Sequence, residues 1–378
     1  MAVARAYLDH ASTSPLRAAA YAAMRPYLES SFGDPGRLHA EGRATRIALE
    51  TAREQVASFF GARPREVVFT SSGTEAVNTA VAGALARAGS RTGSGDAHVV
   101  TTAVEHSCVR DAVARGTTDV TVVGVDRFGR FDARAVVEAV RDDTTLVSVQ
   151  LANHEVGTGQ PVAEVCNALR ERRALVHVDA CAAAGHMGVD FTALGADLCS
   201  VTAHKLGGPL GAGALLIRRG LRVPPFLVGG AQERARRGGI ENVPAWVGFG
   251  AACAVVDLAG ETAAQRALVE RASAVVDRVA GVERFGDRSL PNVLCVGVRG
   301  VEAEPILLAL DQHGVAVHSG SACSSETLEP SPVLEAMGVD ADRSLRISVG
   351  WSSTTADVER FVDVFPGIVE RLRGLRTV

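Results

Sequence analysis

The chain has 378 residues, 47% of them hydrophobic and 22% charged, with a formal net charge of −4 at pH 7. This composition is typical of a globular protein that is too long for one small core. The weak negative net charge does not indicate a surface that binds nucleic acid. Because neither an export signal nor an apolar stretch long enough to cross a membrane is visible, we expect no membrane segment and a cytoplasmic location.

From about residue 44 the sequence alternates between helical and strand periodicity. Apolar residues recur at helical spacing from Ala44 to Phe59, a short β-branched run follows at 66–70, and a second helical stretch covers 75–87. Later apolar runs, separated by polar or helix-like segments, lie at 98–102, 120–125, 146–151, 175–178, 198–202 and 214–217. Strands that alternate with helices predict a mostly parallel sheet covered on both faces.

The pattern changes near residue 260. A long helical segment at 263–279 precedes an apolar run at 292–298, a helix near 304–313 and a second apolar run at 315–318. A last apolar run at 345–349 is followed by a C-terminal helix from about Thr355. This order predicts an α+β unit, and we place a domain boundary near residue 260.

Only one of the 39 Lys and Arg residues is a lysine, Lys205. It lies between an apolar run that ends at Thr202 and a glycine-rich segment at 206–213. A lysine amine forms a Schiff base with a carbonyl, which a guanidinium cannot do. A surface lysine retained by chance is the alternative, but the position between a buried strand and a glycine-rich loop favours a cofactor lysine.

Three further features suit a pyridoxal phosphate site. Asp179 ends an apolar strand, where an acid can protonate the pyridine nitrogen of this cofactor. Gly73 and Thr74 follow a strand and open a helix, an arrangement that suits a phosphate. His106 follows another strand and could stack on a flat ring. Each feature alone has a simpler explanation, namely a helix cap, an ordinary turn and a polar loop, but together with Lys205 they predict pyridoxal phosphate on an aminotransferase-type fold.

The seven cysteines are scattered without CxxC or CxxH spacing, which predicts a reducing compartment and no resident metal site. Six of them lie in apolar runs or beside expected strands and are interpreted as small packing residues. Cys323 differs because it lies among glycine and serine residues. A small residue in a flexible loop remains the alternative interpretation of Cys323.

These residues resemble those of the cysteine desulfurases in the class V aminotransferase superfamily. The similarity runs nearly end to end, from YLDHAST at 7–13, through Asp179 and the pair His204-Lys205, to HSGSACSS at 318–325. The SGSAC loop is the most specific element, because it separates desulfurases of the iron–sulfur-assembly branch from aminotransferases that lack this cysteine.

The resemblance implies a fold type I enzyme with a mostly parallel seven-stranded sheet. It implies a large pyridoxal-phosphate-binding domain at 16–260 and a small α+β domain, made of 1–15 and 261–378, that carries the cysteine loop. It also implies a homodimer in which the segment 232–240 of one subunit completes the site of the other, and a sulfur-acceptor or scaffold protein as partner.

The resemblance further assigns roles to single residues. Lys205 would bind the cofactor and move protons, and Cys323 would attack the sulfur of L-cysteine, leaving alanine and a persulfide. Cys323 could also ligate a cluster transiently. His106 would join them in catalysis. The implied cofactor contacts are Gly73, Thr74, His106, His154, Asp179, Thr202, His204 and Lys205. The implied substrate contacts are Arg346, whose guanidinium would clamp the carboxylate, Asn153 and Ala11.

The sequence departs from the family pattern at three positions beside the expected cofactor. His154 stands where the family usually has Asn, Ala182 where it has Gln, and Ile240 where it has Thr. Each hydrogen bond lost in this way is worth roughly 1 kcal/mol, which the covalent link to Lys205 should survive.

Two other functions stay open from the sequence. One is a class V enzyme of different activity, such as an aminotransferase or a selenocysteine or cysteine C–S lyase, in which Cys323 is dispensable. The other is a weakly active scaffold that docks sulfur-acceptor proteins. The pathway that receives the sulfur is not identified by the sequence.

Overall fold

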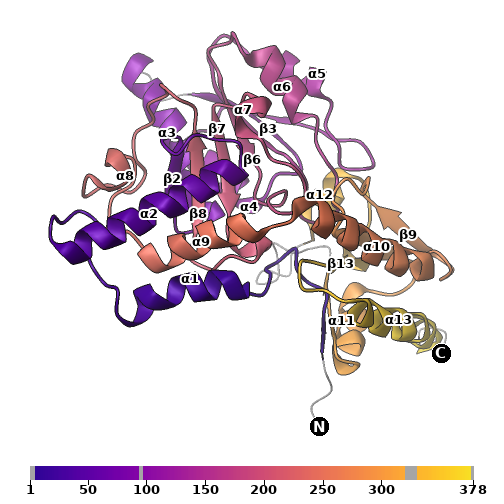
Figure 1. Cartoon of the computed structure of the whole chain (residues 1–378). Helices are drawn as coiled ribbons and strands as arrows, with labels where there is room; N and C mark the ends of the chain where they lie inside the picture. Colours follow the sequence, from indigo (N-terminus) through magenta and orange to yellow (C-terminus); the bar gives the residue numbers. More distant parts are fainter. Residues whose placement is uncertain (1–4, 93–96, 320–329, 376–378) are drawn as a thin grey trace.

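The computed structural model describes residues 5–92, 97–319 and 330–375, apart from the side chains of 89–92. Its largest element is a seven-stranded sheet with the strand order β2-β8-β7-β6-β5-β3-β4 (Figure 1). The strands are β2 (Val67–Thr70), β3 (His98–Thr102), β4 (Val120–Val123), β5 (Thr144–Gln150), β6 (Leu175–Asp179), β7 (Leu198–Thr202) and β8 (Gly213–Ile217). Only β8 runs against its neighbours, so the predicted mostly parallel seven-stranded sheet is confirmed.

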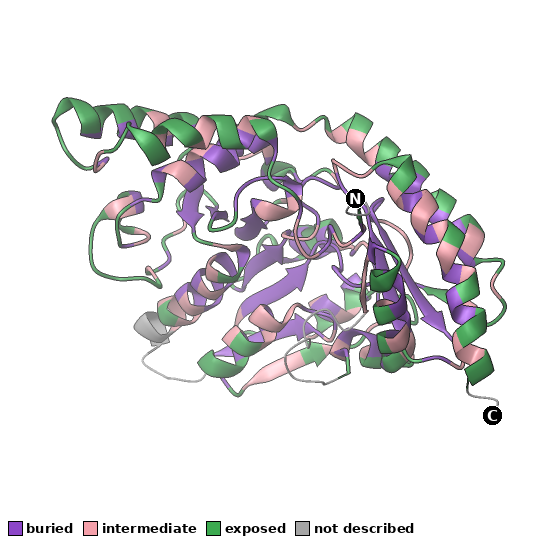
Figure 2. Cartoon of the chain, turned by 90° about the horizontal axis from the view of Figure 1, so that it is seen from below, coloured by how far each residue is buried: buried purple, intermediate pink, exposed green. Residues whose placement is uncertain are grey.

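Both faces of this sheet are buried, which explains why its strands are continuous apolar runs. Successive residues of a strand point to opposite faces: Val67 and Phe69 join one hydrophobic cluster, and Val68 joins another. Helices α3 (Gly73–Thr92) and α4 (Ser107–Gly116) cover one face. The other face is covered by α2 (Ala40–Phe59), α6 (Val162–Leu169) and α9 (Val243–Val255). Figure 2 shows the buried strands inside the layer of helices, which turn their exposed sides outward.

The helices around the large sheet follow the chain order. They are α1 (Ala18–Glu29), α2 (Ala40–Phe59), α3 (Gly73–Thr92), α4 (Ser107–Gly116), α5 (Ala133–Glu138), α6 (Val162–Leu169), α7 (Phe191–Leu194), η1 (His204–Leu206), α8 (Gln232–Ala235) and α9 (Val243–Val255). No single helix in the described ranges is long and apolar enough to span a membrane; α9 and α10, bent by 80° at their junction, pass that test only as a pair, by length and composition.

A second core lies beside the first and contains an antiparallel four-stranded sheet, β12-β13-β10-β9. Its strands are β9 (Val282–Phe285), β10 (Val293–Val298), β12 (His318–Ser319) and β13 (Ser344–Ser348). The helices of this part are α10 (Leu258–Val276), α11 (Ala303–Gln312), α12 (Pro332–Ala336), η2 (Ala341–Arg343) and α13 (Thr355–Leu375).

The N-terminal segment packs with this second core. β1 (Ala6–Tyr7) pairs in parallel with β11 (Val315–Ala316), and Ala6 and Leu8 are buried among the side chains of α10, α11 and α13. The single apolar run expected at 315–318 is split, because its first two residues pair with β1, whereas His318, together with Ser319, pairs with β13. The domain division at 15 and 260 stays a prediction.

Residues 233–235 share an unusual backbone. Glu233, Arg234 and Ala235 all have positive φ, between 48° and 60°, a region that side chains other than glycine rarely adopt. The Glu233 carboxylate is buried and accepts two hydrogen bonds from Arg53 of α2, at 2.6 and 2.7 Å, and one from the Phe69 N–H, at 2.8 Å. Since β2 is an edge strand, these contacts cover its free edge and hold the strained segment in place.

We therefore predict that Glu233→Gln lowers the free energy of unfolding by about 3–5 kcal/mol, because it removes the buried counter-ion of Arg53 and leaves only the partly exposed Glu50, 3.3 Å away, to balance the charge. Urea unfolding measures this change. The control is Glu138→Gln, which breaks an exposed ion pair with Arg134 and should cost no more than about 1 kcal/mol. Equal costs for the two variants would show that Glu233 does not anchor the segment.

Candidate active site

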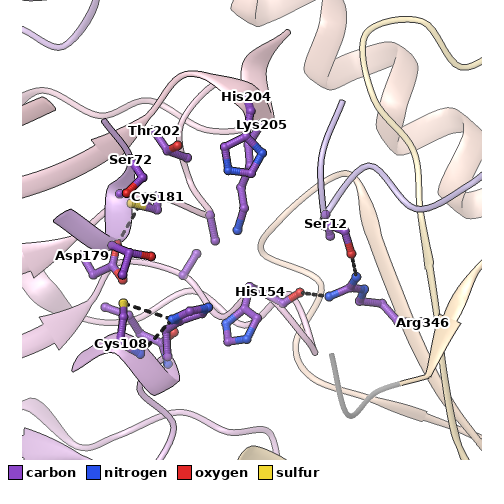
Figure 3. A pocket seen from close by; sticks show the side chains of 17 residues that line it. Ser12, Ser72, Cys108, His154, Asp179, Cys181, Thr202, His204, Lys205 and Arg346 are labelled. Carbon is purple, nitrogen blue, oxygen red and sulfur yellow. Dashed lines mark hydrogen bonds between the residues drawn. The ribbon is translucent and has the colours of Figure 1, made fainter. Parts of the chain in front are cut away.

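A pocket of about 270 Å³ opens at the carboxyl ends of the parallel strands (Figure 3). This is the edge at which polar groups can be placed without interrupting a buried sheet. The loops after β2, β3, β5, β6 and β7 contribute most of its lining. Ala11 and Ser12 of the N-terminal segment and Arg346 of β13 contribute the rest, so the pocket lies between the two hydrophobic cores.

Lys205 lies in η1, three residues after the end of β7, and its side chain extends into the pocket (Figure 3). Thr202, the last residue of β7, also lines the pocket. Its hydroxyl is buried and finds no hydrogen-bond partner among the described residues. A buried hydroxyl without a partner is costly unless a ligand supplies one, so Thr202 marks a point where a polar ligand would bind.

The turn from β2 into α3 is built around Gly73. A Cβ atom on Gly73 would lie only 2.5 Å from the sulfur of Cys181, so the position has no room for a larger side chain. Ser72 caps the helix by accepting a hydrogen bond from the Glu75 N–H at 3.1 Å. Ser72, Gly73 and Thr74 therefore present the start of a 20-residue helix to the pocket, which is favourable for an anion.

Asp179 ends β6 and is almost completely buried at the pocket wall. Its Oδ1 accepts a hydrogen bond from the Cys181 N–H at 3.0 Å, which fixes the carboxylate. Burial and this nearby carboxylate raise the pKa of the Cys181 thiol, so Cys181 stays protonated. Asp179 therefore places a carboxyl group at a fixed position in the pocket wall.

Two histidines face each other across the pocket floor. The rings of His106 and His154 are 5.0 Å apart between centroids, at an angle of 59°. Burial, followed by the neighbouring His154 and Lys205, lowers the pKa of His106 to about 3, and burial also lowers the pKa of His154 well below 6.5. Both rings are therefore neutral at pH 7. His106 Nδ1 caps α4 by accepting the Cys108 N–H, which leaves the ring proton on Nε2.

Arg346 enters the pocket from the opposite side and is fully buried. Its Nη2 donates to Asp9 Oδ1 at 2.7 Å and to Ser12 Oγ at 2.8 Å, and its Nη1 donates to the His154 carbonyl at 3.1 Å. Within the described chain, its Nε has no partner. The guanidinium is thus held rigidly at the pocket, with a donor left over.

Some predicted residues are placed differently from the rest. Asn153 is buried but does not line the pocket: its amide donates to the Val104 carbonyl, and its Oδ1 accepts the N–H groups of Glu155 and Val156, which folds the loop after β5. His204 lines the pocket, where its Nδ1 lies 3.1 Å from the Thr13 hydroxyl. Cys323 lies outside the described residues.

The sequence interpretation did not include several residues that lie in or beside the pocket. Ser12, Ser72, Cys108 and Gln150 line it. Glu155 lies behind His154, 3.4 Å from its Nε2, and burial raises the pKa of Glu155 to about 7. Glu155 directly follows the polar residues Asn153 and His154, so nothing in the sequence distinguishes it from an ordinary loop residue.

The fold and the pocket together define an α/β enzyme class whose site contains a single lysine, a strand-end aspartate and a buried arginine. The class V aminotransferase model matches residues 6–361, and the chain belongs to this family. Its relatives include a cysteine desulfurase IscS of Dictyoglomus turgidum, 41% identical over 380 residues, which covers 98% of this chain and 95% of the relative.

Comparison with solved structures finds proteins with the same fold. A NifS-like protein superimposes with a TM-score of 0.89 at 30% identity, covering 97% of this chain and 100% of its own. The structure of SspA in complex with cysteine matches with a TM-score of 0.80 at 28% identity, covering 92% of this chain and 99% of its own. The predicted fold type I architecture is therefore confirmed.

The close contact at Gly73 gives a direct prediction. Gly73→Ala should destabilise the protein by about 1–3 kcal/mol, because the added methyl group meets the Cys181 sulfur. Combining it with Cys181→Ala should recover part of this loss. The control Gly367→Ala, in α13, meets no atom within 4 Å and should be neutral or stabilising. Thermal unfolding measures all four proteins, and a Gly73→Ala variant as stable as the control would contradict the packing described.

Proposed function

We propose that this protein is a pyridoxal-phosphate-dependent cysteine desulfurase that converts L-cysteine to L-alanine and transfers the sulfur, as a persulfide on Cys323, to an acceptor protein. The observation that carries this proposal is the position of Lys205. The single lysine of the chain extends into a pocket that also contains Asp179 and Arg346. The relatives named cysteine desulfurase, which match nearly the whole chain, support it.

The residues present fit pyridoxal phosphate. The free hydroxyl of Thr202 and the start of α3 suit its phosphate, the Asp179 carboxylate suits its pyridine nitrogen, and the His106 ring suits its flat face. Lys205 would bind it covalently. When bound, the cofactor supplies an electron sink that weakens the bonds around the substrate Cα.

Three residues of the chain would then act on the substrate: Arg346, Lys205 and Cys323. Arg346 would bind the substrate carboxylate, because its guanidinium is fixed and its Nε is left over as a donor. Lys205 would take and return protons at the substrate. The Cys323 thiolate would attack the substrate sulfur, so that the C–S bond breaks, the sulfur remains on Cys323 as a persulfide and the carbon skeleton leaves as alanine.

The departures at the pocket favour one alternative. Ala182 and His154 both line the pocket, and Ala182 brings no polar group to it. Both changes bear on substrate choice more than on cofactor binding. A class V enzyme of another activity, above all a C–S lyase that acts on cysteine or selenocysteine, is therefore the second candidate.

We further propose a homodimer. Large apolar side chains are exposed on α1, on α2 and on the segments around α8, elements that lie on one side of the molecule (Figure 1). The exposed residues are Tyr21, Leu28, Phe32, Leu38, Ile47, Val228 and Ile240. Exposed apolar side chains in such number mark a protein interface, and a second copy of this chain would cover them.

The dimer gives a test. Val228→Asp combined with Ile240→Asp should convert the protein to a monomer, because each charge would be buried in the interface. Light scattering coupled to size-exclusion chromatography measures the mass. Leu375→Asp, at an equally exposed apolar residue of α13, is the control and should remain a dimer. A monomeric unmodified protein would contradict the proposal.

The cysteines support a reducing, cytoplasmic location. The six described cysteines are all free, as expected in a compartment where thiols stay reduced.

Burial raises the pKa of Cys166 to about 12, so this thiol does not ionise at neutral pH. Cys166 therefore serves as a control for the nucleophile.

Lys205→Arg should abolish the visible absorbance band of the covalently bound cofactor, because a guanidinium does not condense with an aldehyde. Adding a surface lysine to that variant, with Arg134→Lys on the exposed face of α5, should not restore the band. Reconstitution with pyridoxal phosphate followed by absorbance spectroscopy makes the measurement. A band that persists in Lys205→Arg would show that the lysine assignment is wrong.

Cys323→Ser should retain the cofactor and its spectral response to L-cysteine but release no alanine, because a serine hydroxyl stays protonated at neutral pH and is a poor nucleophile toward sulfur. Cys166→Ser should retain most of the turnover. Mass spectrometry after a pulse of L-cysteine should place the persulfide on the peptide containing Cys323. Normal alanine production by Cys323→Ser would show that Cys323 is not the nucleophile and would contradict the persulfide mechanism.

A further inference from the structure

A second, much smaller cavity adjoins the pocket beside Lys205. It has room for the centre of one water-sized sphere, about 10 Å³. Ala11, His154, Ala182 and Lys205 line both spaces, so the two are neighbours. His186 and Asn292 line only the smaller one. It therefore lies behind the lysine, on the side where Ala182 replaces a longer side chain.

Two buried acceptors belong to this cavity. Asn292 is 1% exposed and His186 is 3% exposed, and neither Asn292 Oδ1 nor His186 Nε2 has a hydrogen-bond partner in the described part of the chain. Leaving such a group unpaired costs about 1–3 kcal/mol. Two unpaired groups in one small cavity point to a bound donor.

The protonation of His186 shows which kind of ligand is needed. Burial lowers the pKa of His186 to about 4, and the charge of Lys205 acts in the same direction, although the contacts to Gln265 and to the Lys205 backbone oppose it. The ring is neutral at pH 7. Its Nδ1 lies 3.0 Å from Gln265 Oε1, and with the single ring proton on Nδ1 the ring donates to this oxygen and Nε2 is an acceptor.

Size and chemistry select the ligand. A cavity of this volume holds one water molecule, and buried waters make two to four hydrogen bonds to polar groups that would otherwise be unpaired. A water molecule has two protons, one for each acceptor, and its oxygen can accept a third bond. Lys205 is the remaining side chain of the lining that carries only donors.

We propose that this cavity binds one water molecule, which donates to Asn292 Oδ1 and His186 Nε2 and accepts a hydrogen bond from the Lys205 amine, so that Asn292 and His186 are positioning residues for the lysine. Ala182 keeps the space open, because a longer side chain there would occupy one of the two adjoining cavities. The contact to the lysine rests on the proposed function of Lys205, whereas the water site itself does not.

A crystal structure of the unmodified protein tests the site directly. We expect ordered water density within hydrogen-bond distance of both Asn292 Oδ1 and His186 Nε2. Density that contacts neither atom, or only one of them, would overturn the proposal. Because this experiment needs no variant and no turnover, its result does not depend on whether the protein desulfurates cysteine.

A double-mutant cycle tests the coupling through the water. Asn292→Leu and His186→Leu should each lower the unfolding temperature of the cofactor-free protein, since each leaves the water and the other acceptor underbonded. The double variant should lose clearly less than the sum of the two single losses. Additive losses would overturn the bridge. The control pairs Asn292→Leu with His98→Leu, a buried histidine whose two ring nitrogens contact Thr144 and Thr121, and should be additive.

The lysine contact has its own readout. Asn292→Leu and His186→Leu should both shift the pH midpoint of the visible absorbance change of the cofactor-loaded protein, and His98→Leu should not shift it. Equal pH midpoints in all these proteins would show that the water has no effect on Lys205, and would overturn the positioning role of Asn292 and His186. If the midpoints shift but L-cysteine yields no alanine, the proposed function fails and this inference stands.

Discussion

The buried guanidinium of Arg346 is the constraint on which the pocket depends. A charge that is removed from water must be compensated, and Arg346 finds its partners on two other segments of the chain. Asp9 and Ser12 belong to the N-terminal segment, and the His154 carbonyl belongs to the loop after β5 of the large sheet. One side chain of the second core therefore holds both segments at the pocket.

Burial also determines the charge of the histidines and of one carboxyl group in and around the pocket. It lowers the pKa of His106 to about 3 and the pKa values of His177 and His204 to about 4, so these imidazoles are neutral at pH 7. It raises the pKa of Glu105 to about 8, which leaves this carboxyl mostly protonated. The lining also contains the amine of Lys205, the carboxyl group of Asp179 and the guanidinium of Arg346.

Local patterns in the sequence predict the strand-end residues well. Asp179, Thr202 and Lys205 each lie at or just after an apolar run, and a parallel sheet brings the ends of such runs to one edge. The inward turn of Asn153 could not be predicted, because its hydrogen-bond partners are set by the loop geometry after β5.

Contacts between distant segments are also beyond the sequence patterns. The cavity behind Lys205 joins Ala182, His186 and Asn292, residues that no local periodicity relates to one another. The split at 315–318 has the same origin, since pairing with β1 and β13 decides where each strand ends. The role of Cys323 rests on the resemblance of its loop, which lies outside the described residues.

Product analysis tests the central claim most directly. The purified, cofactor-loaded protein would be incubated with L-cysteine without any partner protein, and alanine, pyruvate and sulfide would be quantified. The account predicts one alanine for each sulfur atom recovered, either as enzyme-bound persulfide or, once an added thiol such as dithiothreitol has reduced that persulfide and become a disulfide, as sulfide. Pyruvate in place of alanine would identify a C–S lyase, and the absence of any product would leave a scaffold role; either result would contradict the account.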